Sequence, residues 1–186
     1  MVVAFARPRR AGPRAERNVG GAHVGRILSE RRGRALLNLY PPFLFQGIRI
    51  LDVGPGFRSC RVRVARSLLT RNLNGTTFGG AIYAAADPMY SLMYWQVFAR
   101  RGEAVQVWLR SASARYLKPA ATALTFTCRL DDREIEEAAA VLDREGRFVR
   151  TYRIDATDEA GTVCAVVDTE VYMRRTRAGQ KEVSAF

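Results

Sequence analysis

The segment that decides the fold is NLNGTTFGGAIYAAADPMYSLMYWQVFA, residues 72–99. Its one charged residue is Asp87, and arginines bound it at both ends. An apolar run of this length without a polar face predicts a helix that the rest of the protein covers on most sides. Residues 79–98 are long enough to span a bilayer, but a central aspartate costs about 3 kcal/mol on insertion scales. We therefore expect no membrane insertion.

The flanking segments alternate between apolar and polar residues, which is typical of half-buried strands. Strands are expected over residues 47–53, 57–64, 104–117, 121–130, 147–156 and 162–174. A first helix is expected over 23–39, stopped by Pro41 and Pro42. A small amphipathic helix is expected over 132–145, where Asp131 precedes the helix and forms a capping box with Glu134.

This order predicts an α+β fold in which a curved antiparallel sheet of about six strands wraps around one long apolar helix. An N-terminal helix and one small extra helix complete it. The chain has 186 residues, of which 48% are hydrophobic, so we expect one domain over 23–175. A disordered basic leader over 1–22 and a flexible tail over 176–186 are expected to flank it.

The net charge of +12 is concentrated near the start, where residues 1–34 hold nine arginines and two acids. Such a leader suits a disordered tail, a transit peptide or a nucleic-acid contact; we favour the first and expect no nucleic-acid partner. The less basic remainder suits anionic ligands such as coenzyme A phosphates, or simple solubility.

The inventory of reactive side chains is short. The three cysteines are far apart, so neither a disulfide framework nor a zinc site is expected, and a reducing cytoplasm fits best. The single histidine, His23, lies near the leader, and there is no Gly-x-Ser-x-Gly motif. If the protein is a hydrolase, a carboxylate is the natural base or nucleophile, and Asp87 is the candidate.

Burial is expected to raise the pKa of Asp87 toward the range of a general base. Gly79 and Gly80 would let a ligand approach backbone N–H groups that favour a developing oxyanion. Other interpretations stay open. Asp87 and Pro88 could start or kink the helix, and the glycines could only permit close helix–sheet packing.

Phe78-Gly79-Gly80, followed six residues later by Asp87, resembles the His-Gly-Gly and Ala-Asp signature of hot-dog acyl-CoA thioesterases of the phenylacetate-pathway type. Residues 113–120 are similar to the strand and turn that follow in those enzymes. The Asn-Gly-Thr-x-Phe-Gly-Gly and Asp-Pro motifs resemble an uncharacterised hot-dog family most closely. Two departures are Phe78 in place of histidine and Pro88 directly after Asp87.

The resemblance implies a hot-dog domain that hydrolyses a fatty or aromatic acyl thioester, with Asp87 as catalytic carboxylate and the amides of Gly79 and Gly80 polarising the carbonyl. It also implies a homodimer or dimer of dimers, with coenzyme A present only as part of the substrate and no other cofactor. The alternative is a hot-dog protein that binds acyl-CoA or an acyl chain without turnover.

Further candidate substrate contacts are more weakly supported. Thr77 and Phe78 belong to the motif, and Asn74 could position substrate, although Asn before Gly is first a turn signal. Arg115 and Lys118 could meet coenzyme A phosphates or simply be solvated. Several apolar residues could line a greasy pocket or pack in the core: Leu68, Leu69, Phe78 and Met89. The aromatic residues of the central helix suit the core or a dimer interface: Tyr83, Tyr90, Tyr94, Trp95 and Phe98.

Overall fold

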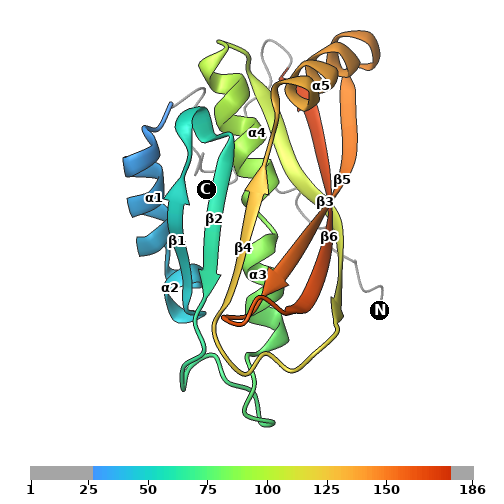
Figure 1. Ribbon diagram of the computed structural model, residues 1–186. Coiled ribbons are helices and arrows are strands. Elements are labelled where there is room, and N and C mark those ends of the chain that lie inside the picture. Colours follow the sequence, from blue (N-terminus) through green and yellow to red (C-terminus); the bar gives the residue numbers. More distant parts are fainter. Residues whose placement is uncertain (1–26, 177–186) are drawn as a thin grey trace, which may run out of the picture.

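The computed structural model describes residues 27–176 and contains one antiparallel sheet of six strands (Figure 1). The strands are β1 (Ile48–Val53), β2 (Ser59–Val64), β3 (Val105–Tyr116), β4 (Leu124–Arg129), β5 (Arg147–Thr157) and β6 (Val163–Arg175), in the order β1-β2-β4-β5-β6-β3. All six strand predictions are confirmed to within three residues at each end. The expected leader and most of the expected tail lie outside the described residues.

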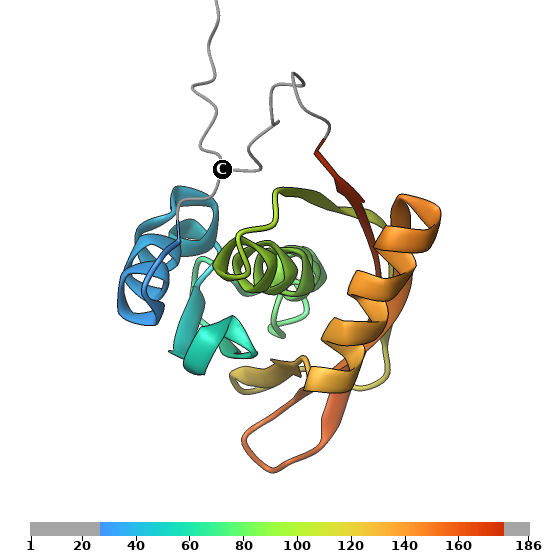
Figure 2. The same ribbon diagram turned by 90° about the horizontal axis from the view of Figure 1, so that it is seen from above.

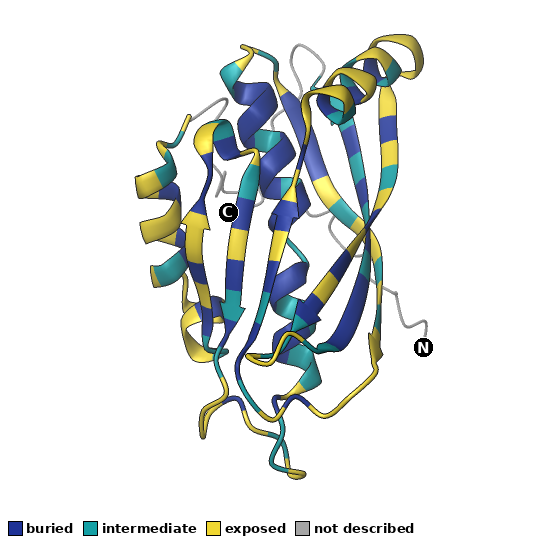
Figure 3. Ribbon diagram, viewed as in Figure 1, coloured by how far each residue is buried: buried dark blue, intermediate teal, exposed yellow. Residues whose placement is uncertain are grey.

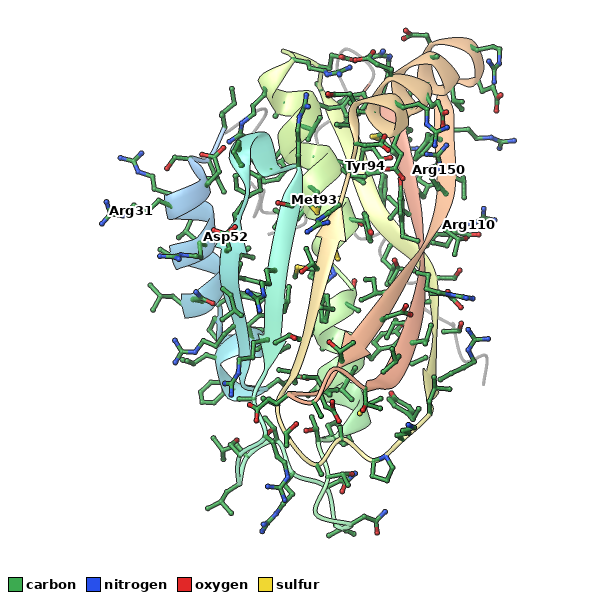
Figure 4. The ribbon with its side chains drawn as sticks, viewed as in Figure 1. Arg31, Asp52, Met93, Tyr94, Arg110 and Arg150 are labelled. Atoms are coloured by element: carbon green, nitrogen blue, oxygen red, sulfur yellow. The ribbon has the colours of Figure 1, made fainter. Side chains whose placement is uncertain are left out.

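The sheet curves around the central helix, as Figure 2 shows from above. Side chains alternate between the concave, buried face and the outer face, which gives the banded strands of Figure 3. Along β2, for example, Cys60, Val62 and Val64 are buried, whereas Arg61 is exposed. Figure 4 shows Met93 and Tyr94 between the central helix and the sheet. Apolar burial in this concave face therefore holds the helix to the sheet.

The central helix consists of two segments, α3 (Gly79–Ala86) and α4 (Met89–Arg100). Asp87 ends α3 and donates its backbone N–H to Tyr83 O at 3.0 Å. Pro88 has no N–H to donate to Ala84, so the hydrogen-bond ladder is interrupted there. Of the two alternatives left open by the sequence, the structure therefore has the kink at Pro88 within the long central helix. The helix begins at Gly79, so Asp87 is not its N-cap.

The small helix α5 (Asp132–Glu145) lies outside the sheet beside β5 and begins with the predicted capping box (Figure 1). Asp131 accepts from Glu134 N at 2.7 Å, and Glu134 accepts from Asp131 N at 3.0 Å. Gly146 ends the helix with φ +70, a left-handed conformation that favours glycine.

The first helix ends at Leu39 as predicted but begins later than expected; residues 23–26 of the expected helix lie outside the described residues. Residues 27–29 are not helical, and α1 (Glu30–Leu39) begins after Ser29, whose side chain accepts from Arg32 N. Pro41 and Pro42 do not simply stop the chain, because they open a second short helix, α2 (Pro41–Phe45). Proline is tolerated there since the first helical N–H groups need no partner inside the helix.

Helix α1 closes one edge of the sheet. The Asn38 side chain accepts from Ile50 N at 2.7 Å and donates to Ile50 O at 3.0 Å, so it takes the place of a neighbouring strand on β1. The opposite edge is different: β3 pairs with β6 on one side, and no described strand covers its other side. Within residues 27–176 the sheet therefore has one closed edge at β1 and one open edge at β3.

We expect Asn38→Ala to lower the free energy of unfolding by about 1–2 kcal/mol, because two hydrogen bonds to the β1 edge are lost and only partly replaced by water. The neighbouring Leu39→Ala is the matched control, since Leu39 is exposed and its loss should change stability by less than about 0.5 kcal/mol. Urea denaturation followed by circular dichroism measures both. Equal effects would show that the Asn38 bonds do not stabilise the edge.

Candidate active site

One stripe of the central helix is left partly open by the sheet. Tyr83, Asp87, Ser91 and Trp95 recur every four residues and are half-buried, whereas most of their neighbours are buried. Residues four apart lie on the same side of a helix, and the backbone of Asp87 and Pro88 stays in the right-handed helical region across the break. This stripe is the least covered side of the helix among the described residues, although the Ser91 hydroxyl on it is itself buried.

Asp87 carries the only carboxylate of the stripe. Its side chain forms no hydrogen bond or ion pair with any of residues 27–176. Burial raises the pKa of the Asp87 carboxyl above its ordinary value. An unpaired carboxylate with a raised pKa is suited to accept a proton near neutral pH.

Ser91 is a candidate that the sequence interpretation missed. Its hydroxyl oxygen is buried and has no hydrogen-bond partner, which is true of no other buried side-chain nitrogen or oxygen in the described part of the chain. Buried hydroxyls are normally satisfied, so an orphan suggests a missing water or ligand. The four-residue spacing from Asp87 was visible in the sequence, but nothing there showed that the hydroxyl lacks a partner.

The N-terminus of α3 presents two backbone donors. The N–H groups of Gly79 and Gly80 donate to no described acceptor, since the first helical bonds run from Ala81 and Ile82 to Phe78 O. A Cβ on Gly80 would lie 2.3 Å from the Phe78 ring, and one on Gly79 would lie 2.7 Å from the Tyr116 ring. Both glycines therefore allow aromatic rings to approach the helix start.

Tyr116, at the end of β3, holds this helix start in place. Its hydroxyl donates to Gly79 O at 2.9 Å. Thr77 is buried and donates its N–H to Ala120 O at 3.0 Å, which ties the preceding loop to the loop after β3. The structure thus brings together Thr77, Phe78 and the two glycines around one backbone corner.

The other predicted contacts form no hydrogen bond with this corner in the described part of the chain. Asn74 is exposed at the tip of a turn, where its N–H donates to the Asn72 side chain and Gly75 has φ +76. Arg115 is exposed and pairs with Asp168 at 3.4 Å. Lys118 is exposed in the loop after β3 and forms no ion pair with a described acid. Leu68 and Leu69 are exposed, whereas Met89 is fully buried in the core.

Within residues 27–176, no cluster of three His, Cys, Asp or Glu side chains could hold a metal ion. None of the helices over the same residues is long and apolar enough to cross a membrane.

We expect Asp87→Asn to stabilise the protein at neutral pH. A raised pKa means that the folded protein binds the Asp87 proton more tightly than the unfolded chain, so stability is lost as pH rises through that pKa. The asparagine variant lacks this loss, and its advantage should vanish below about pH 4, where the native carboxyl is protonated too. Melting temperatures at pH 4 and pH 7 test this, with the exposed Asp155→Asn as the control; a variant less stable at pH 7 would contradict it.

Comparisons with known proteins identify the fold and the family of this chain. Solved structures share the fold. A Pseudomonas aeruginosa protein described as a probable thioesterase has a TM-score of 0.68 and 21% identity, over 80% of this chain and 97% of that one. A Haemophilus influenzae thioesterase has a TM-score of 0.59 and 16% sequence identity, over 82% of this chain and 94% of that one. The E. coli PaaI protein of the phenylacetic acid degradation operon has a TM-score of 0.54 and 14% identity, over 79% of this chain and 92% of that one.

At these identities the likeness shows the hot-dog fold alone, and no curated protein matches the chain. The sequence matches the model of a domain of unknown function, DUF4442, over residues 29–173. This chain therefore belongs to the DUF4442 family and has the hot-dog fold.

Proposed function

We propose that the protein hydrolyses an acyl thioester, with Asp87 as the general base. The observation that supports this most directly is the Asp87 carboxylate, which is half-buried, unpaired and raised in pKa on the open stripe of the helix. A half-buried carboxylate that served only to stabilise the fold would be expected to form a hydrogen bond or an ion pair. The solved structures that share the fold and are described as thioesterases support the same reaction.

In the proposed reaction, the Asp87 carboxylate takes a proton from a water molecule while the water oxygen attacks the thioester carbonyl carbon. The carbonyl oxygen becomes an oxyanion, which the N–H groups of Gly79 and Gly80 stabilise. When the carbonyl re-forms, the C–S bond breaks and the thiolate leaves, taking up the proton from Asp87. The products are a carboxylic acid and a free thiol. The Ser91 hydroxyl, four residues from Asp87, is placed to orient the attacking water.

A site shared by two copies suits this chemistry best. Gly80 and Asp87 are seven residues apart, about 10 Å along a helix. In one copy, a water and a carbonyl would have to lie end to end to bridge that distance. In a two-fold dimer whose axis is perpendicular to the central helices, these helices run in opposite directions, so Asp87 of one copy can lie opposite Gly79 and Gly80 of the other. The open edge of β3, 12 residues long, is the proposed dimer contact.

The surroundings of the helix start suggest the substrate class. Phe78 is an exposed aromatic ring beside the two glycines, and Leu68 and Leu69 lie exposed in the loop before it. Such apolar surface suits a fatty or aromatic acyl group. The exposed Lys118 suits the phosphates of coenzyme A, which enters as part of the substrate, and no further cofactor is required. A cytoplasmic location is consistent with the three free, buried cysteines.

A second candidate function is acyl-CoA binding without turnover. Phe78 favours it, because this position holds histidine in the thioesterase motif that the sequence resembles. The two functions differ in whether the thiol is released, which the following experiment measures directly.

We expect release of free thiol from a panel of short, long and aromatic acyl-CoA substrates, and a loss of at least about 100-fold in kcat for Asp87→Asn. Ser91→Ala should lower kcat by about 10-fold, and Ser91→Thr, which keeps the hydroxyl, should retain most of it. The native kcat should fall as pH falls through the raised pKa of Asp87. Asp155→Asn serves as the control. Binding without thiol release would favour the non-catalytic function, and activity that survives in Asp87→Asn would exclude Asp87 as the base.

The shared site predicts complementation between two inactive variants. Asp87→Asn removes the base, and Gly80→Val blocks the approach to the helix start, where only the exposed Phe78 ring must move aside. Mixed dimers isolated with two different affinity tags should recover about half of the native activity, because one of their two sites is intact. Sedimentation of the native chain should give twice its 20.8 kDa mass. A monomer, or mixed dimers no more active than their parents, would overturn the shared site.

A further inference from the structure

Two neighbouring short helices at the closed edge of the sheet expose large apolar side chains beside arginines. The surface, called here the α1–α2 face, consists of Arg31, Arg32, Leu36, Leu39, Leu44 and Phe45. Leu39 is 72% exposed and Phe45 is 69% exposed. Scattered exposed leucines are normal in proteins, but four large apolar residues within ten positions form a patch.

The fold does not account for this patch. The inner side of α1 makes the contacts that attach the helix: Gly33 packs against the Phe57 ring, Leu37 is buried, and Asn38 bonds to β1. The start of the helix is fixed separately, since Arg100 donates to Leu28 O and pairs with Glu30 at 3.3 Å. The outer side, with Leu36 and Leu39, makes no such contact with residues 27–176.

The patch is surrounded by positive charge that acids do not neutralise. Arg31, Arg32 and Arg34 of α1 form no ion pair with a described acid, and Figure 4 shows Arg31 pointing away from the molecule. The imbalance is regional: residues 27–76 contain nine arginines and two acids, whereas residues 77–176 contain thirteen basic and fourteen acidic residues. The net positive charge of the described domain thus comes from α1, β1, β2, the turn between β1 and β2, and the loop after β2.

We propose that the α1–α2 face docks on the surface of a lipid bilayer that contains anionic phospholipids. Leucine and phenylalanine side chains can insert among the acyl chains at the boundary, while the arginines meet the phosphate groups. This combination identifies the partner by its chemistry: an apolar layer beneath a negatively charged surface.

Other occupants fit the same residues less well. Exposed leucines add nothing to binding a nucleic-acid backbone, where arginines act with stacking aromatic rings. A second copy docked through the same face would set its unpaired arginines against identical arginines. The face also lies at the sheet edge opposite β3, so it stays accessible in a dimer formed through β3 (Figure 2).

The test is flotation of the full chain with vesicles of phosphatidylcholine alone or with phosphatidylglycerol added. We expect binding only to the anionic vesicles, weakened by 0.5 M salt, roughly the range in which surface charges are screened. Leu36→Ser/Leu39→Ser/Phe45→Ser should reduce binding by about 10-fold or more. Arg31→Gln/Arg32→Gln should reduce it by about 30-fold.

The matched control is Val149→Ser/Arg147→Gln, which removes an exposed apolar and an exposed basic side chain of β5 and should leave binding unchanged. All variants keep the arginines of residues 1–26, so binding that persists in both α1–α2 variants would assign it to those arginines and overturn the proposal. Absence of vesicle binding, or binding to polyuridylate RNA alone, would overturn it too. Thermal melting verifies that each variant is folded, and hydrolysis of a soluble thioester reports separately on the proposed function.

Discussion

The enclosure of α3 and α4 by the curved sheet is the constraint on which the rest of the structure depends. Met89, Met93, Tyr94 and Phe98 are fully buried against it, and a helix can be buried on this scale only if it carries almost no charge. The sheet must in turn be long and curved enough to surround it. Only one stripe of the helix then remains accessible, and any chemistry of the domain interior must use that stripe.

Much of the fold follows from local sequence signals. Alternating polarity located all six strands, and the capping box located the start of α5, because both patterns depend on residues close together in the chain. The end of α1 at Leu39 was predicted, whereas its start was placed too early and α2 was missed, since Pro41 and Pro42 are compatible with either ending or starting a helix. The open edge of β3 could not be predicted, because strand order is set by contacts between distant segments.

The candidate site was only partly predictable for the same reason. Asp87 was found because an isolated charge in an apolar run is visible in the sequence. Ser91 was not, because a serine in a helix can usually bond to a backbone carbonyl one turn earlier, and only the three-dimensional structure shows that this one does not. The sequence left two interpretations of Asp87 and Pro88, a helix start or a kink within a longer helix. The kink is observed, because both helix segments pack in the core.

The central helix is the most deeply buried element, and it contains three unfavourable features within five residues, at Asp87, Pro88 and Ser91. The carboxylate lacks a partner, the proline removes a backbone donor, and the hydroxyl is unsatisfied. An asparagine or alanine at these positions would keep the shape of the helix without these costs. Packing therefore gives no reason for the combination, whereas the water of the proposed reaction would give both side chains a hydrogen-bond partner. This convergence on one stripe is the physical reason to seek the function there.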